Sequence, residues 1–281
     1  MSQHEVWTEE IKSEYSLFDL NLKEVWRYRD LVYLLVKRDF VTSFKQTVLG
    51  PLWFFIQPIL TTLTYVIIFG NVAKLSTDGA PMFLFYLAGA TLWNYFSTSL
   101  SATATVFQAN AGIFGKVYFP RLVMPLSIVI SNLMRTGVQF ILFLFVLFYY
   151  IYKGETHPNA WVLATPLLII IMAFLALGLG MILSSITTKY RDFSILISFG
   201  IQLFMYATPV IYPISQMPEW ARGYAMLNPL TGIFECFKYG YLGVGDFSPI
   251  MLVYSAVISF IILAIGIVTF NKVQRSFMDT V

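Results

Sequence analysis

Residues 160–183, AWVLATPLLIIIMAFLALGLGMIL, decide the class of this chain, because they carry no charge and almost no polar group. The charge-free run around them extends over residues 156–188. A helix of about 20 apolar residues is long enough to cross the hydrocarbon core of a bilayer. This stretch therefore predicts a membrane-spanning helix.

Four more charge-free runs lie at 46–73, 79–115, 193–218 and 247–271. The chain is 58% hydrophobic and 12% charged, whereas soluble domains are about 45–50% apolar and about 25% charged. One soluble core of 281 residues cannot bury such a surplus, and disorder requires the opposite composition. The sequence predicts an all-α polytopic membrane protein whose domain at 49–281 has six spans, near 51–71, 83–106, 125–151, 160–183, 193–212 and 249–271.

An even number of spans places both termini on one side of the membrane, and the basic residues indicate which side. With cytoplasmic termini, 13 of the 18 Lys and Arg residues lie in cytoplasmic segments, 4 lie in external loops and Arg135 lies within the third span. Cytoplasmic loops carry the excess of basic residues in membrane proteins. We therefore expect cytoplasmic termini, and no cleavable signal peptide, since the leader at 1–19 is acidic rather than apolar.

Two segments do not fit a simple pattern of spans. Residues 20–48 alternate charged and apolar positions at three- to four-residue spacing, which favours an amphipathic helix at the cytoplasmic interface over a soluble packed helix. Residues 209–248 are too apolar for an ordinary loop and are interrupted by four prolines. Non-helical backbone at membrane depth must be buried in protein or line a wet cavity. We expect a re-entrant external element at 213–245, with a hairpin on the outer leaflet as the alternative.

Arg135 lies about 15 Å into the third span at a rise of about 1.5 Å per residue. An arginine near the bilayer centre costs about 2.5–3.5 kcal/mol on insertion scales. Two interpretations stay open. The side chain either faces a water-filled path and attracts an anionic substrate, such as a phosphate or an acidic sugar, or it is structural and bonds to helix carbonyls or to Asn132 and Gln139.

Aromatic residues make up 17% of the chain. Flat rings pack on the apolar faces of sugars, but the interfacial belts of membrane proteins enrich the same residues. Trp93, Tyr95 and Phe96 lie in the middle of the second span, where a belt does not explain them. Catalytic chemistry is sparse, since the chain has 2 His, 1 Cys and no GxxxxGK[ST] loop. We expect no catalytic residue, metal or cofactor on this chain, and no nucleic-acid partner for a net charge of +3.

Five segments together resemble one known family. They are WRYRDLVYLLVKRDFVTSFKQTVLGPLWFFIQP (26–58), GKVYFPRLVMPL (115–126), TTKYRDF (187–193), TPVIYPISQMPEW (208–220) and LNPLTGIFE (227–235). In this order and spacing the chain resembles the permease subunit of type-2 ABC exporters for cell-surface polysaccharides, which include O-antigen, capsule and teichoic-acid exporters. The resemblance covers nearly the whole chain after residue 20. The alternatives are a teichoic-acid, capsule or small-molecule exporter of the same architecture and a membrane-embedded enzyme acting on glycolipids.

The resemblance implies that two copies of this chain form a channel for a lipid-linked polysaccharide, above all O-antigen, in the bacterial inner membrane. It also implies two copies of a cytoplasmic ATPase, which would hold ATP and Mg²⁺. The residues implied to couple to the ATPase are Arg38, Lys45, Lys116, Tyr118, Phe119, Pro120, Arg121, Lys189, Tyr190, Arg191 and Asp192. The external gate is assigned to Tyr212, Pro213, Trp220, Asn228 and Pro229, and the substrate channel to Trp93, Tyr95, Phe96 and Arg135.

Overall fold

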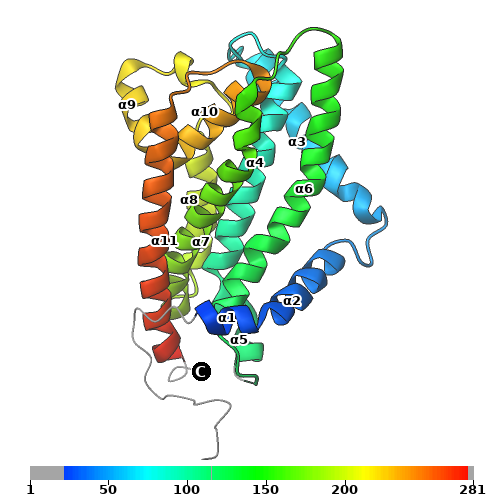
Figure 1. Ribbon diagram of the computed structural model, residues 1–281. Coiled ribbons are helices and arrows are strands. Elements are labelled where there is room, and N and C mark those ends of the chain that lie inside the picture. Colours follow the sequence, from blue (N-terminus) through cyan, green and yellow to red (C-terminus); the bar gives the residue numbers. More distant parts are fainter. Residues whose placement is uncertain (1–21, 115, 278–281) are drawn as a thin grey trace, which may run out of the picture.

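The computed structural model describes residues 22–114 and 116–277, and in that part of the chain it contains only helices and loops (Figure 1). The acidic leader expected at 1–19 lies outside these residues. In chain order the elements are α1 (Leu22–Arg27), α2 (Arg29–Thr42), η1 (Gly50–Leu52), α3 (Trp53–Tyr65), the π-helix η2 (Val66–Val72), α4 (Met82–Ala104), α5 (Val106–Phe114), α6 (Val123–Tyr152), η3 (Ala160–Ala164), α7 (Thr165–Lys189), α8 (Phe193–Tyr206), η4 (Ile214–Gln216), α9 (Glu219–Leu227), α10 (Pro229–Leu242) and α11 (Pro249–Phe277).

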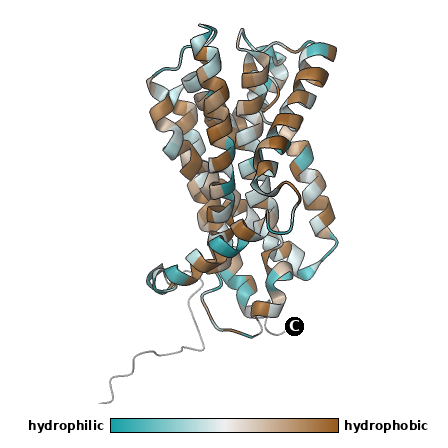
Figure 2. Cartoon of the chain, turned by 90° about the vertical axis from the view of Figure 1, so that its right-hand side faces the viewer, coloured by the Kyte–Doolittle hydropathy of each residue, from teal (hydrophilic) through white to brown (hydrophobic). Residues whose placement is uncertain are grey.

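The long helices run side by side in one bundle, with α9 and α10 at one end and α1, α2 and α5 at the other (Figure 1). Apolar residues cover the middle of the bundle, and hydrophilic residues gather toward its two ends (Figure 2). This distribution matches the slab of hydrocarbon that such a bundle must cross. The chain is therefore a multi-pass membrane protein.

Four helical segments among the described residues are long and apolar enough to cross a membrane: Gly50–Val72, Val123–Tyr152, Ala160–Lys189 and Pro249–Gln274. They correspond to the first, third, fourth and sixth expected spans. The second expected span forms α4, which has 23 residues, and the fifth forms α8, an apolar helix of 14 residues. Since α8 ends at Tyr206 rather than near residue 212, the count of six spans stays a prediction.

Helix α4 is the central helix of the bundle, and 16 of its 23 residues are buried. It packs against α3, α6 and α7. Protein rather than lipid surrounds most of it, so it tolerates Asn94 and a series of serines and threonines that a lipid-facing helix would avoid. Its polar content explains why hydropathy singles it out less clearly than its neighbours.

Helices α7 and α11 approach each other closely at two glycines. A Cβ atom on Gly178 would lie 2.7 Å from the backbone of Leu263, and one on Gly266 would lie 2.9 Å from the Cα of Gly178. Small residues allow backbones to approach in this way in membrane bundles, where dispersion forces replace the hydrophobic effect.

The amphipathic segment expected at 20–48 forms two helices rather than one, because the backbone at Tyr28 leaves the helical conformation between α1 and α2. Helix α2 packs against α6 and buries Leu35 and Val36, while Trp26 and Tyr33 stay exposed. It leaves the lower end of the bundle at a steep angle to the long helices (Figure 1). It therefore runs obliquely rather than across the bundle axis, and its place at the interface stays a prediction.

The segment expected at 213–245 contains a short exposed helix and a longer buried one. In α10, 12 of the 14 residues are buried, against α4, α7 and α11. The helix begins at Asn228, whose side chain accepts a bond from the N–H of Leu230, and Pro229 is its first residue. It ends at Gly243, which has a φ of 72° in the left-handed region that favours glycine. Helix α9 instead exposes Trp220.

Candidate functional site

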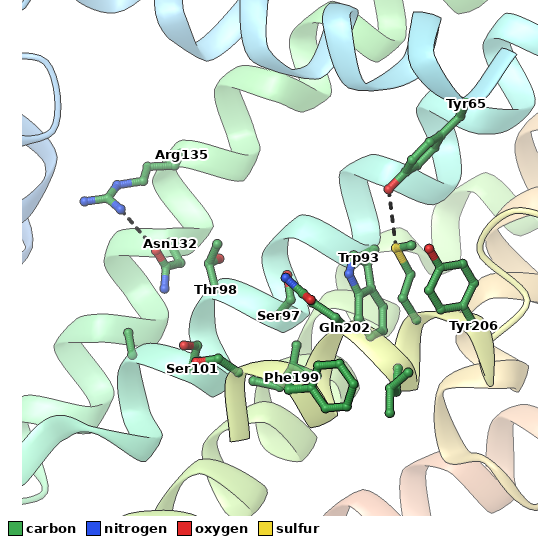
Figure 3. A pocket seen from close by; sticks show the side chains of 15 residues that line it. Tyr65, Trp93, Ser97, Thr98, Ser101, Asn132, Arg135, Phe199, Gln202 and Tyr206 are labelled. Carbon is green, nitrogen blue, oxygen red and sulfur yellow. Dashed lines mark hydrogen bonds between the residues drawn. The ribbon is translucent and has the colours of Figure 1, made fainter. Parts of the chain in front are cut away.

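A groove of about 810 Å³ lies between α4 and α8, with Tyr65 of α3 toward one end and Arg135 of α6 at the other (Figure 3). Seven of its lining residues come from α8, which is otherwise exposed and buries only Ile201. The hydroxyl of Tyr65 lies 3.3 Å from the sulfur of Met205 and so joins α3 to α8. The groove is lined by Tyr65, Trp93, Ser97, Thr98, Ser101, Ala102, Asn132, Arg135, Ser198, Phe199, Ile201, Gln202, Leu203, Met205 and Tyr206.

The polar lining of the groove was missed by the sequence reasoning. Ser97, Thr98 and Ser101 form a hydroxyl-bearing face on α4, and Gln202 presents an amide from α8 (Figure 3). The signal that could have found this face is the recurrence of polar residues every three or four positions from Asn94 onward, which marks one side of a helix. Such a face inside an apolar bundle offers hydrogen bonds to a polar ligand.

Of the three aromatic residues expected in the channel, one lines the groove and two do not. Trp93 lines the groove, whereas Tyr95 and Phe96 are buried at 1% and 0% exposure and do not line it. The ring of Phe96 lies 5.6 Å from that of Trp93 and 6.0 Å from that of Phe204, measured between centroids. Phe96 therefore supports the groove wall from behind.

Arg135 lines the groove and also holds helix α2. Its guanidinium donates to the backbone carbonyl of Asp39 at 2.9 Å and to the side-chain oxygen of Asn132 at 3.5 Å. Asp39 lies in the last turn of α2, where carbonyl groups lack helical partners and a positive charge is favourable. The carboxylate of Asp39 instead pairs with Arg38 at 2.8 Å. Arg135 thus both faces the groove and makes structural hydrogen bonds. Gln139, the other partner expected for it, accepts a bond from Asn94 instead.

Most residues assigned to ATPase coupling lie on the segments 116–121 and 189–192, toward the end of the bundle where α1 and α5 are found, whereas Arg38 and Lys45 belong to α2 and the loop after it, which rise from that end (Figure 1). Most of them are exposed. The ring of Tyr190 lies 5.1 Å from the ammonium group of Lys189, in a cation–π contact. The exposed members of this set are Arg38, Lys45, Lys116, Tyr118, Lys189, Tyr190, Arg191 and Asp192.

Two members of the same set are anchors rather than contact residues. Phe119 is 6% exposed and stacks on Phe114, with ring centroids 5.7 Å apart. Arg121 donates to the backbone carbonyl of Gln274 on α11 and lies 5.8 Å from the Phe114 ring. These contacts fix the loop at 116–122 to the base of the bundle, and Pro120 is partly buried.

Two of the five residues assigned to the external gate contact the C-terminal end of α8. The Tyr212 hydroxyl donates to the carbonyl of Tyr206, the last residue of α8. The Asn228 amide donates to the carbonyl of Ala207 at 3.2 Å and to the hydroxyl of Thr208 at 2.9 Å. Of the other three, Pro213 precedes η4, Pro229 begins α10, and Trp220 is 75% exposed on α9, away from these contacts.

A buried ion pair near the same end was not predicted from the sequence. Its lysine, Lys238, is one of the four basic residues expected in external loops. Lys238 and Glu235 of α10 are 1% and 0% exposed, and their charged atoms lie 3.9 Å apart. Burial lowers the pKa of Lys238 to about 8, against the opposing effect of the Glu235 carboxylate. Burial likewise raises the pKa of Glu235. The sequence feature that could have revealed this pair is two opposite charges at i, i+3 spacing inside an apolar run.

Known proteins with a similar sequence indicate the family of this chain. Over 253 residues, the chain is 30% identical to an O-antigen export system permease protein, RfbA, of Klebsiella pneumoniae, covering 89% of this chain and 94% of that one. An RfbA of Myxococcus xanthus is 29% identical over 92% of this chain and 98% of its own length. The capsule polysaccharide export inner-membrane protein CtrC of Neisseria meningitidis is 22% identical over 74% of this chain and 78% of its own length. The family model for ABC-2 type transporters matches residues 30–242, and the chain belongs to that family.

Proposed function

We propose that this chain is the channel-forming subunit of an ATP-driven exporter that moves a lipid-linked polysaccharide, of the O-antigen kind, across the bacterial inner membrane. The groove between α4 and α8 carries this proposal. Its volume of about 810 Å³ and its lining of hydroxyls, an amide and Trp93 suit a sugar chain. Hydroxyls and amides satisfy the polar edges of sugars, and an aromatic ring packs on their apolar faces.

A second copy of the chain is the proposed cover of the groove. Serine, threonine, glutamine and arginine side chains in the groove are costly to expose to lipid. Next to them, α8 presents large apolar side chains, with Ile195 73%, Leu196 60% and Phe199 59% exposed. A facing copy would bury this surface and close two grooves into one water-filled channel.

The ATPase is the proposed partner at the end that carries α1 and α2. Exposed basic and aromatic residues there, Lys116 and Tyr118 among them, offer a docking surface to two ATPase copies. ATP and Mg²⁺ would bind to those copies, and no catalytic residue is assigned to this chain. Both termini then lie in the cytoplasm, as the excess of basic residues favours.

The segment 213–245 is the proposed external gate. Helix α8 has 14 residues, which span about 21 Å of a hydrocarbon core of about 30 Å. The bend after α8 and the buried α10 complete the remaining depth. The exposed Trp220 of α9 suits the outer interface, where tryptophan is enriched.

Reconstitution tests the proposal. The chain is purified with the ATPase that associates with it, placed in proteoliposomes and given lipid-linked O-antigen. We expect ATP-dependent transfer of the glycan across the bilayer, lost when the ATPase cannot hydrolyse ATP. Thr98→Val with Gln202→Leu removes hydrogen bonds from the groove and should slow transfer about tenfold, while Gly137→Ala on α6 should not.

Three results would overturn or replace this function. The absence of any associated ATPase, together with no effect of ATP, would refute it. Transfer of capsule polymer or teichoic acid but not O-antigen would change the substrate, and the similarity to CtrC makes capsule polymer the first to try. Chemical modification of the glycolipid without movement would favour a membrane enzyme.

A further inference from the structure

The buried pair Lys238 and Glu235 lies on α10 and lines neither the groove nor the proposed docking surface. Both side chains are removed from solvent, at 1% and 0% exposure. Two charges placed in a low-dielectric interior lose their hydration, and their attraction compensates only when further hydrogen bonds satisfy them. The partners that supply those bonds therefore indicate what the pair holds together.

The ammonium group of Lys238 binds the bend that follows α8. It donates to the carbonyl of Pro209 at 2.6 Å and to the carbonyl of Tyr212 at 3.3 Å. It also lies 4.2 Å from the centroid of the Phe85 ring of α4, within cation–π range. One side chain of α10 thus joins the bend to the central helix.

The two prolines of the bend explain why a lysine is needed there. In a continuing α-helix the carbonyl of Pro209 would accept a bond from the N–H four residues later. That residue is Pro213, which has no N–H group. A buried carbonyl without a partner is costly. The ammonium of Lys238 takes the place of the missing donor.

From the bend, the contacts lead directly to the groove. Lys238 binds the carbonyl of Tyr212, and the Tyr212 hydroxyl donates to the carbonyl of Tyr206. Tyr206 lines the groove at the end away from Arg135 (Figure 3). On the other side of the pair, a carboxylate oxygen of Glu235 accepts a bond from the N–H of Asp246 at 3.0 Å, in the loop before α11.

We infer that Lys238, held by Glu235, is a positioning residue that fixes the C-terminal end of α8 and thereby the outer mouth of the groove. Releasing it frees the two carbonyls and lets the bend move relative to α4. The inference rests on the proposed function for the identity of the outer side. It concerns the position of α8 and not the transported substrate.

The test replaces the pair as a unit, because Lys238→Met alone leaves a buried carboxylate unpaired and can prevent folding. Apolar replacement of a whole buried pair is often neutral for stability, so Lys238→Met with Glu235→Leu is the main variant. The control is Lys153→Met with Glu155→Leu. That pair lies at the end of α6 with its charges 3.8 Å apart and about half exposed.

Accessibility of the groove is the readout. A Gln202→Cys reporter in the full complex is exposed to a membrane-impermeant maleimide added from the external side. The native cysteine, Cys236, is 0% exposed but lies between the two replaced residues. Labelling of the pair variant without the reporter therefore measures its background. We expect the reporter to react about tenfold faster in the pair variant, the factor that one charge-assisted hydrogen bond is worth. The control pair should leave the rate unchanged.

The inference would be overturned if the pair variant folded, bound the ATPase, and showed the same rates of reporter labelling and export as the protein with the native pair. Should that variant fail to assemble, Glu235→Gln keeps the shape and an acceptor for Asp246 while removing the charge. It should raise labelling by a smaller factor, and no rise would again refute the role. Labelling does not depend on transport, so loss of export in every protein, the unaltered one included, would count against the proposed function alone.

Discussion

Replacing Arg135 by methionine should release α2 from the bundle. Methionine keeps the apolar stem but removes the donors to the Asp39 carbonyl, at 2.9 Å, and to Asn132, at 3.5 Å. The first is a charge-assisted bond worth about 1.5–3 kcal/mol, and the second is too long to add much. The positive charge near the end of α2 adds about 0.3–1 kcal/mol. The docked state of α2 should therefore lose about 2–3 kcal/mol.

Hydrogen exchange of the α2 amides measures this loss directly. At about 1.4 kcal/mol per factor of ten, opening of residues 29–42 should become about 30 to 150 times more frequent. Amides in α7 should keep their protection, because α7 packs away from Arg135. If α2 carries the ATPase, the same variant should hydrolyse ATP with less export for each ATP consumed.

The matched control is Arg38→Met, which removes an arginine from α2 itself. Its ion pair with Asp39 is partly exposed, at 46% and 24%, and such pairs contribute about 0–1 kcal/mol. Exchange in α2 should change less than fivefold. Equal protection of α2 in the Arg135→Met protein and the unaltered protein would refute the capping role. Arg135 would then serve the groove alone.

Three further changes give distinct outcomes. Gly178→Ala forces a Cβ against the backbone of α11 at 2.7 Å and should destabilise the protein by about 1–3 kcal/mol in detergent unfolding, whereas Gly137→Ala meets open space and should stabilise it by up to about 1 kcal/mol. Because the pKa of Lys238 is lowered to about 8, the unfolded chain binds more protons above that pH. The contribution of Lys238 to the free energy of unfolding should rise by up to about 2 kcal/mol from pH 8 to about 9.5. Burial raises the pKa of the Cys236 thiol to about 11, which acts in the opposite direction. The contribution is therefore read as the difference from the protein with Lys238→Met and Glu235→Leu, and a flat difference would contradict it. Phe119→Ala should cost about 3–5 kcal/mol of stability, whereas Tyr118→Ala, at an exposed ring, should cost much less stability and weaken ATPase association in pull-down assays.

The four helices that are long and apolar enough to cross a membrane were predictable, because hydropathy depends on local composition alone. The run at 160–183 lies within Ala160–Lys189, and the run at 249–271 lies within Pro249–Gln274. Helix α8 was harder, since its apolar run continues past Tyr206 into the bend. Composition does not reveal where a helix stops when the residues that stop it, Pro209 and Pro213, lie within that run.

The site was predictable only in part, because its contacts join residues far apart in the sequence. From the sequence, Lys238 looks like a charged residue of a loop. Its partners Pro209 and Tyr212 lie 29 and 26 positions earlier, so only the fold shows that they are in contact. Arg135 was recognised as unusual from its position in a span. Its partner Asp39, 96 positions away on α2, could not be inferred from a local pattern.

The polar face of α4 has a consequence for how the chain enters the membrane. Helices insert into the bilayer in order from the N-terminus, and each must be apolar enough to leave the translocon. With Asn94 and its hydroxyl-bearing neighbours, α4 is a marginal candidate for insertion by itself. Its packing against α3 compensates for this, because α3 is already in the bilayer when α4 enters and can shield those groups. We expect α3 and α4 to enter as a hairpin, and a glycosylation-site reporter after α4 to reveal failed insertion when residues 50–72 are deleted.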